Sequence, residues 1–438
     1  MTFAPDDYDY LNDTMDLYLH GKDAGFSEVE GFNRWMSHAK QADHYVFELA
    51  RSPRLAGGTQ PGLLHYNDCI DFSSYDYLGM AKHPAVIEAA NKAQHDYGLG
   101  ATGSPILSGT LKLHLELQQA ILDYFDRPAL GVSLFTTGYN VSLGLIPCFY
   151  DKRDIIYLDQ AAHMSIRDGA LLSGAKVVNF KHNDLANLQH KLERQRRLFR
   201  RALICTEGIF SVDGDAGDIA GISALARQHD AQLLVDEAHS ALIGGPGGRG
   251  IAAAQGVLEQ VDFFVFTFSK ALGGLGGAVI TTKDKANYIN WYARCRMFSC
   301  ALPPGVTGGM IQALRLSQSS VGDERRAQLH QHVATLGAII GGRIDTNNSK
   351  SWIVPLIFRD EKFSLPICKA FIDRRCMTSN IQFPAVPKGQ ARTRLFLSAL
   401  HTTEQVERLG QACLEIFTQF DRLLDCRPHT HETKVASS

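Results

Sequence analysis

The sequence lacks the features that mark a membrane protein or a disulfide-stabilised scaffold. Its nine cysteines form no C-x-x-C pair, so neither a zinc ribbon nor a disulfide framework is indicated, and no metal site is predicted. No uninterrupted apolar run reaches the roughly 18 residues that a membrane-spanning helix requires. Residues 1–21 also lack the basic and apolar regions of a signal peptide.

An excess of charge of one sign is also absent. The chain has 44 Lys and Arg residues against 46 Asp and Glu residues, so no basic surplus favours binding to a nucleic acid or an anionic membrane. Scattered cysteines without pairing fit a reducing compartment. We therefore expect a cytoplasmic protein with no nucleic-acid partner and no integral membrane association.

The length of 438 residues allows two or three domains at roughly 150 residues each. Residues 1–70 are predicted to form an acidic arm and helix, because the first thirty residues carry eight acidic side chains and one basic one, Lys22. We expect a large domain over residues 71–310, a smaller domain over 311–425 and a flexible tail over 426–438.

Short apolar runs rich in β-branched residues alternate with stretches that suit amphipathic helices. The runs are DIIYLD, KVVNF, ALICTEG, AQLLVDEA, DFFVFTFS and GGAVITT. This alternation is typical of an α/β fold with a mostly parallel sheet covered on both faces. One helix is expected to begin at Pro84 and to end at Gly98. From about Ser351 the pattern changes and predicts a smaller C-terminal α+β domain.

Three short motifs allow interpretations that their context does not favour. Residues 98–103 read G-L-G-A-T-G, but a helical segment precedes them, whereas the dinucleotide fingerprint follows a strand. Residues 236–239 read D-E-A-H without a phosphate-binding G-x-x-x-x-G-K-[ST] loop elsewhere. The basic run at residues 191–201 is interpreted as a solvated helix face, or alternatively as a patch for an anionic carrier or nucleotide tail.

A lysine follows one of the apolar runs. Residues 263–266 predict a buried strand, and Lys270 comes shortly after it, beside the turn A-L-G-G. An amine at the mouth of an apolar strand is costly unless it is paired or used covalently. Desolvation lowers the pKa of such an amine and makes it a Schiff-base nucleophile. A structural lysine at a strand end is the alternative.

Two further strand ends carry polar side chains. Residues 233–235 deliver Asp236, with His239 three residues on, and both are expected to point into the crevice at the carboxyl ends of the strands. A buried Asp236 needs a cationic partner, such as a protonated pyridine ring that acts as an electron sink. Residues 136–140 (TTGYN) suit a phosphate cradle or a plain helix cap. His163 follows the strand IIYLD and is either functional or structural.

Together these segments resemble the α-oxoamine synthase family of pyridoxal 5′-phosphate (PLP) enzymes, which have the aspartate-aminotransferase fold (fold type I). The resemblance covers about residues 71–420 and looks most similar to the serine palmitoyltransferase branch. It implies a large PLP-binding domain and a homodimer with shared active sites. The matching segments are SSYDYLGMAKHP, GATGSPILSGT, FTTGYN, LDQAAHMSIRDG, EGIFSVDGDAGD, VDEAHS, GPGGRG, TFSKALGG, FSCALPP and PAVPKGQARTRLFLSALHT.

The resemblance implies roles for the residues around the cofactor ring. Lys270 would form the imine with PLP and later remove the Cα proton of the amino acid. Asp236 would hold the pyridinium nitrogen, and His163 would stack on the ring face. His239, together with Ser211, would hold the ring O3′ oxygen. Lys270, His163, Asp236 and His239 are therefore the predicted catalytic residues.

The resemblance also implies how the phosphate is held. Thr137, Gly138, Tyr139 and Thr267 would bind it within the chain, and Ser299 of the partner subunit would reach it from the other side.

For the substrate, Arg394 would grip the amino-acid carboxylate, a bidentate task that suits arginine over lysine. Tyr75 and Ser104 would also contact the substrate.

The implied reaction is a decarboxylating condensation of an amino acid, serine or alanine preferred, with acyl-CoA or an acyl carrier protein. It yields an α-amino ketone, CO2 and the free thiol. The alternatives are a glycine C-acyltransferase or 2-amino-3-ketobutyrate ligase-type enzyme, a non-catalytic partner subunit, and a PLP aldolase or aminotransferase.

Four positions depart from the family pattern. Tyr75 replaces a usual Asn, Pro105 an Arg, Leu242 a Gly, and Cys300 a Thr or Ala. These departures leave the PLP chemistry intact, but they leave open which substrates the enzyme uses.

Overall fold

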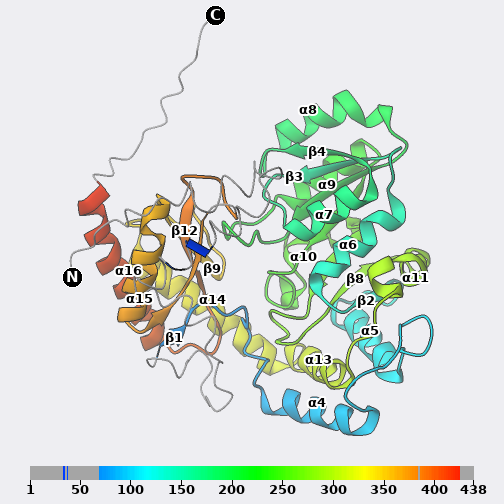
Figure 1. The fold of residues 1–438 in the computed structure, drawn as a ribbon, viewed down its shortest axis with the longest axis horizontal. Coiled ribbons are helices and arrows are strands. Elements are labelled where there is room, and N and C mark those ends of the chain that lie inside the picture. The colour runs from blue at the N-terminus through cyan, green and yellow to red at the C-terminus, as the bar shows by residue number, and fades with distance from the viewer. Residues whose placement is uncertain (1–32, 35–36, 38–68, 383–384, 425–438) are drawn as a thin grey trace, which may run out of the picture.

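The computed structural model describes residues 33, 34, 37, 69–382 and 385–424, which form two lobes (Figure 1). The predicted acidic arm at residues 1–70 lies almost entirely outside these residues, as does the predicted tail at 426–438. Among the described residues, no helix combines the length and the apolar composition needed to cross a membrane.

The larger lobe is built on a seven-stranded sheet in the order β2-β8-β7-β6-β5-β3-β4. Strands β7, β6, β5, β3 and β4 run parallel, whereas β8 is antiparallel to both of its neighbours, β2 and β7. The sheet is therefore mostly parallel, as predicted. Its strands are β2 (Gly131–Phe135), β3 (Ile155–Asp159), β4 (Lys176–Phe180), β5 (Ala202–Glu207), β6 (Gln232–Asp236), β7 (Phe263–Thr267) and β8 (Gly277–Thr281).

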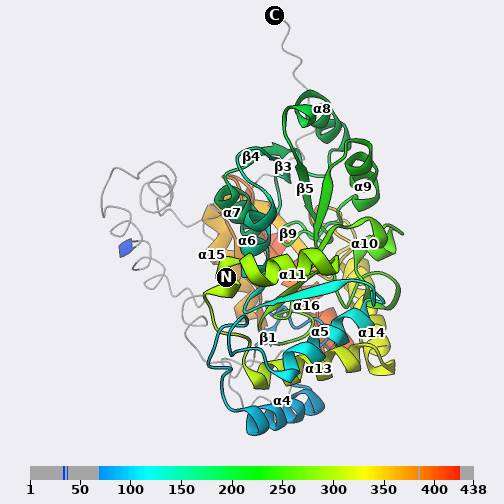
Figure 2. The same cartoon turned by 90° about the vertical axis from the view of Figure 1, so that its right-hand side faces the viewer.

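Helices cover both faces of this sheet (Figure 2). Alternate residues of β3 pack to opposite sides: Ile155 and Tyr157 belong to one apolar cluster, and Ile156 and Leu158 to the other. Such two-sided burial explains why the strands are continuously apolar in sequence. The helices are α4 (Pro84–Tyr97), α5 (Lys112–Tyr124), α6 (Gly138–Phe149), α7 (Met164–Ser173), α8 (Leu185–Gln195), α9 (Ile219–Gln228), α10 (Ile251–Ala254), α11 (Lys283–Tyr292), α12 (Arg294–Met297) and α13 (Pro304–Ser317).

The helix predicted after residue 83 is confirmed. Helix α4 begins at Pro84, where the missing N–H of proline costs nothing, and Gly98 caps its end with a positive φ of 88°. It packs against α13, where a Cβ on Gly308 would lie 2.5 Å from the Cβ of Ala93. The small residue allows the two helices to approach closely.

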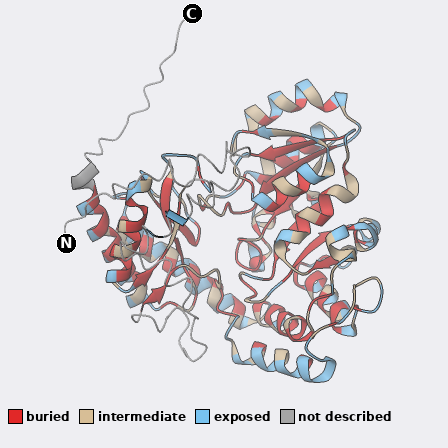
Figure 3. Ribbon diagram, viewed as in Figure 1, coloured by how far each residue is buried: buried red, intermediate tan, exposed pale blue. Residues whose placement is uncertain are grey.

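Helix α14 (Ser320–Ile340) leads from the larger lobe into the smaller one. The smaller lobe contains the antiparallel sheet β11-β12-β9, and β1 (Ile70–Asp71) pairs parallel with β10 there, beside the C-terminal elements. Buried residues fill the interior of both lobes (Figure 3). The strands and helices of the smaller lobe are β9 (Ile353–Arg359), α15 (Ser364–Asp373), β10 (Cys376–Met377), β11 (Ser379–Ile381), β12 (Ala391–Phe396) and α16 (Thr403–Leu424).

Candidate active site

One cavity of about 260 Å³ lies at the carboxyl ends of β5, β6 and β7. In open parallel sheets this edge is where ligands bind. The structure brings eight of the predicted site residues to it: Thr137, Gly138, Tyr139, His163, Asp236, His239, Thr267 and Lys270. The other lining residues are Ser165, Glu207, Ala238, Val265, Phe266 and Ser269.

Lys270 lies three residues beyond the end of β7, half-buried, with Nζ 5.9 Å from the centroid of the Tyr75 ring. Burial lowers the pKa of Lys270, while the negative charges of Asp236 and Glu207 act in the opposite direction. A lowered pKa increases the fraction of neutral amine, which is the nucleophilic form. The position therefore suits covalent capture of an aldehyde.

Asp236 is the last residue of β6 and is buried, with Oδ1 accepting a hydrogen bond from the Ala238 N–H at 2.9 Å. Burial raises the pKa of Asp236, and the nearby Lys270 and His163 lower it. A buried carboxylate is stabilised by a cation placed against it. A protonated ring nitrogen in the cavity would supply that cation.

Glu207, which the sequence analysis missed, lies beside Asp236. The two are register partners on β5 and β6, and Glu207 Oε1 accepts a hydrogen bond from the His163 N–H at 2.5 Å. Burial raises the pKa of Glu207 well above its ordinary value. Glu207 therefore positions His163 through its backbone N–H. Its signal in the sequence is the same as that of Asp236, an acidic residue at the end of an apolar run.

The two predicted histidines are held differently. His163 caps α7, and its Nδ1 lies 2.8 Å from Ser165 Oγ. His239 is buried, and its Nδ1 lies 2.7 Å from the Tyr77 hydroxyl, a second partner that the sequence analysis missed. Burial lowers the pKa of His239 well below its ordinary value. It is therefore a neutral imidazole that can hydrogen-bond a ring oxygen.

The N-terminus of α6 lies where the sequence predicts a phosphate cradle. Thr137 is its N-cap and accepts a hydrogen bond from the Asn140 N–H at 3.2 Å. The first-turn N–H groups of a helix and its dipole favour a bound phosphate. The hydroxyl of Tyr139 donates to Asp168, so the backbone N–H is what this residue can offer to the phosphate. Thr267 Oγ1 lies next to this helix start, 2.9 Å from Ser269 Oγ.

Arg394 on β12 is buried without a carboxylate partner among the residues that the structure describes. One guanidinium nitrogen donates to the Ser211 carbonyl at 2.8 Å, another lies 3.3 Å from the Tyr75 hydroxyl, and Nε has no partner. Burial lowers the pKa of Arg394. Because an unpaired buried guanidinium is costly, the arrangement fits a substrate carboxylate. Tyr75 links it to Lys270.

Besides Arg394 and Tyr75, which lie beside the cavity, three predicted site residues do not line it. Ser211 contacts Arg394 through its carbonyl, while Ser104 and Ser299 lie elsewhere in the chain, and the Ser104 hydroxyl is buried without a partner. Their roles toward the cofactor and substrate stay predictions.

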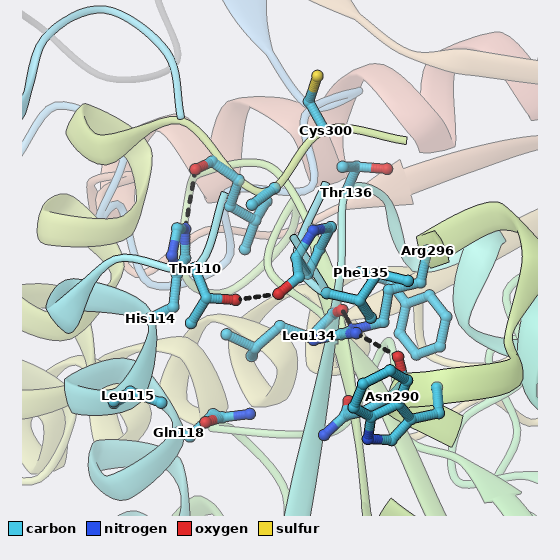
Figure 4. Close-up of a pocket in the computed structure, with 15 residues that line it drawn as sticks. Thr110, His114, Leu115, Gln118, Leu134, Phe135, Thr136, Asn290, Arg296 and Cys300 are labelled. Atoms are coloured by element: carbon cyan, nitrogen blue, oxygen red, sulfur yellow. Dashed lines mark hydrogen bonds between the residues drawn. The ribbon is translucent and has the colours of Figure 1, made fainter. Parts of the chain in front are cut away.

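Two of the unusual positions, Pro105 and Cys300, meet at a second cavity of about 270 Å³. Figure 4 shows Cys300, Thr136 and Arg296 around it, and Thr136 directly precedes the phosphate cradle. Leu242, a third, has a positive φ of 71° and a buried side chain. A left-handed backbone is what glycine adopts without strain, which agrees with the glycine that the family resemblance implies there.

The profile of the aminotransferase class I and II family matches residues 67–412. The chain is 34% identical over 371 residues to an 8-amino-7-oxononanoate synthase of Geotalea daltonii, covering 84% of this chain and 94% of that protein. It is also 34% identical over 348 residues to a serine palmitoyltransferase of Sphingobacterium spiritivorum, covering 80% and 86%. A solved serine palmitoyltransferase variant from S. paucimobilis with a PLP–myriocin aldimine superposes with a TM-score of 0.83 at 28% identity, covering 90% and 98%.

The chain belongs to the aminotransferase class I and II family and, within it, to the α-oxoamine synthases. This confirms the predicted fold, the PLP cofactor and the enzyme class. The cavity fits PLP, since Lys270, Asp236 and the first residues of α6 all line it. Because both kinds of synthase are 34% identical to the chain, identity alone does not separate their substrates.

Gly138 tests whether the α6 N-terminus holds the phosphate. A Cβ on Gly138 would lie 2.6 Å from Thr267 Oγ1 and 2.7 Å from Thr267 Cβ. We expect Gly138→Ala to displace Thr267 and to raise the Kd for PLP by about tenfold or more, as losing one charge-assisted hydrogen bond does. The measurement is PLP titration of the apoprotein. Gly337→Ala is the control, because its Cβ would meet nothing within 4 Å on α14. Equal Kd values for both variants would contradict the assignment.

Proposed function

We propose that this enzyme condenses serine or alanine with an acyl thioester, either acyl-CoA or an acyl carrier protein. The products are an α-amino ketone, CO2 and the free thiol. The proposal depends on one observation: Lys270, Asp236 and His163 line one cavity beside a buried arginine that has no carboxylate partner among the described residues. An amino acid with its α-carboxylate on Arg394 satisfies that arginine.

Each side chain has a distinct task. PLP, when bound, supplies an electron-withdrawing ring that stabilises negative charge on the amino-acid Cα. Lys270 would hold the cofactor and, as a free amine, would take the Cα proton of the amino acid. Asp236 keeps the ring nitrogen protonated. His163, oriented through Glu207 and Ser165, hydrogen-bonds first the substrate carboxylate and later the new carbonyl.

The preference for serine or alanine over glycine is supported by Tyr75. Its ring lies between Lys270 and Arg394, where the amino acid would bind, and its segment is similar to that of the serine palmitoyltransferase branch. The similarity in shape to a solved serine palmitoyltransferase supports the same preference. A glycine-using enzyme is the alternative. A non-catalytic subunit is disfavoured because the chain retains Lys270, Asp236 and His163.

The amino acid and the donor can be identified in one assay. The visible absorbance of the holoenzyme is recorded with L-serine, L-alanine and glycine, and each carboxyl-labelled amino acid is then mixed with acyl-CoA or acyl carrier protein. We expect serine or alanine to perturb the spectrum and to release labelled CO2 only when the thioester is present.

Arg394 provides the matched variant for this assay. Arg394→Lys removes bidentate pairing, so we expect the KM for the amino acid to rise about tenfold to a hundredfold. Arg359→Lys on the surface, where Arg359 pairs with Asp345, should leave KM unchanged. The proposal is wrong if none of the three amino acids perturbs the spectrum, and glycine alone doing so would favour the alternative.

We also propose that the enzyme is a homodimer whose partner completes the site. Large apolar side chains are exposed around the second cavity and next to Ser299: Leu107, Leu115, Trp291 and Phe298 are exposed to 83%, 57%, 60% and 82%. An apolar patch of this kind is typical of a subunit interface. Dimerisation there would let Ser299 of the partner subunit approach the phosphate.

Phe298→Glu tests the interface. A carboxylate buried at an apolar interface is destabilising, so we expect this variant to be monomeric by size-exclusion chromatography with light scattering and to bind PLP more weakly. Leu198→Glu, at a leucine exposed to 75% on a short 3-10 helix, should stay dimeric. A wild-type monomer that retains full PLP affinity would refute the proposal.

Location and donor docking are the remaining parts of the proposal. We place the enzyme in the cytoplasm, and the eight described cysteines, all outside disulfides, agree with a reducing compartment.

The basic run at residues 191–201 leads into the amino end of β5. It therefore lies at the edge of the sheet opposite the cavity, and Arg196 and Arg200 pair there with Asp230 and Asp154. That position favours the solvated helix face over a docking patch.

A further inference from the structure

An ion cluster that the chemistry above does not use lies at the carboxyl end of β3. His182, between β4 and α8, has Nδ1 2.9 Å from Asp159 Oδ1 and Nε2 2.9 Å from Asp215 Oδ2. Because an ionised carboxylate only accepts hydrogen bonds, both ring nitrogens donate and the imidazole is protonated. Burial acts to lower the pKa of His182, but the two carboxylates outweigh it and raise the pKa to about 10. The cluster is a cation between two anions at neutral pH.

Asp215 belongs to a compact turn, the 209–216 hairpin. Ile209 and Ala216 form a β-bridge, and the Phe210 N–H donates to the Asp215 carbonyl at 2.9 Å. The Phe210 ring lies edge-on to His182 at 4.4 Å between centroids. The His182 ring therefore contacts the base of the hairpin in two ways, one ionic and one apolar.

The tip of the hairpin contacts the smaller lobe. The Ser211 carbonyl accepts from Arg394 at 2.8 Å, Asp213 pairs with Arg392, and the Gly214 carbonyl accepts from Ser351 Oγ at 2.7 Å. Arg392 and Arg394 are both on β12. The hairpin is thus a link between the carboxyl edge of the main sheet and the strand that carries the substrate arginine.

We propose that His182 is a positioning residue: by bridging Asp159 and Asp215 it fixes the 209–216 hairpin so that the Ser211 carbonyl aims Arg394 at the amino-acid carboxylate. This inference depends on the proposed function, because it assumes that Arg394 binds that carboxylate. It adds a residue outside the cavity that controls affinity for the amino acid without touching cofactor or substrate.

The contacts of Arg394 explain its sensitivity to the hairpin. Its Nε has no partner, its contact with the Tyr75 hydroxyl is long at 3.3 Å, and its guanidinium lies 4.9 Å from the Phe396 ring centroid. The Ser211 carbonyl, at 2.8 Å, is the shortest of these polar contacts. A shift of the hairpin would therefore change the direction of the guanidinium more readily than a shift of any other partner.

Variants of Asp215 separate this role from general stability. Asp215 Oδ2 accepts from both His182 and Asn183. Asp215→Asn keeps an acceptor oxygen at that position, whereas Asp215→Ala removes it. The Asp215 side chain is 24% exposed. We expect Asp215→Ala and His182→Gln to raise the Kd for the amino acid about tenfold, the effect of one lost charge-assisted contact. Asp215→Asn should restore the wild-type value.

The readout is the change in visible absorbance of each holoenzyme on titration with L-serine, L-alanine or glycine, beside the Kd for PLP. We expect the Kd for PLP to change less than the Kd for the amino acid, because Lys270, Asp236 and the α6 N-terminus lie outside the hairpin and Ser211 is its one predicted cofactor contact. Arg200→Gln is the control: it removes the buried Asp154 pair at the opposite edge of the sheet and should leave the amino-acid Kd unchanged.

Two results would overturn the inference. One is an unchanged amino-acid Kd in Asp215→Ala, and the other is equal weakening in Asp215→Ala, Asp215→Asn and Arg200→Gln, which would indicate a structural role only. If the wild-type holoenzyme responds to none of the amino acids, the proposed function itself fails, and this inference with it.

Discussion

The opposed charges of Lys270 and Asp236, placed at the ends of neighbouring strands in one buried cavity, are the constraint on which the rest of the site depends. Burial lowers the pKa of the amine and raises that of the carboxyl, and each group's charge counters the shift of the other. Opposite charges removed partly or wholly from water stabilise each other only if their geometry is held. The parallel strands β6 and β7, paired Asp236 to Val265, hold it.

The residues around Lys270 and Asp236 are also positioned from this edge of the sheet. Glu207 on β5 adjoins Asp236 and fixes the backbone of His163, and Tyr77 fixes His239 from the segment that leads away from β1. Because β1 pairs with β10 in the smaller lobe, Tyr75 and Tyr77 come from a stretch of chain held between the two lobes. The cofactor side of the site thus depends on the large sheet, while the substrate side depends on how the lobes meet.

The site residues that come directly after apolar strands could be predicted from the sequence. Lys270, Asp236 and His163 each follow a run of buried apolar residues, and parallel strands bring such ends to one edge. Strand GGAVITT was predicted, but nothing in its composition shows that β8 runs antiparallel to β7, because burial on both faces favours the same residues in either direction.

Contacts between segments far apart in the chain were not predictable in this way. The hydroxyl of Tyr139 meets Asp168, and Tyr77 meets His239 across 162 positions. His182 was missed because a histidine in a turn carries no signal until Asp159 and Asp215 are brought to its two nitrogens. The strands β10 and β11 are only two and three residues long, too short for a periodic pattern.

The most direct test of the account is the site at which PLP is attached. The holoenzyme is reduced with borohydride and digested, and the modified peptide is identified by mass spectrometry. The account predicts a reduced pyridoxyl group on Lys270 and none in Lys270→Ala. A modified lysine elsewhere in the chain, or an unmodified Lys270 in a protein that has bound PLP, would contradict it.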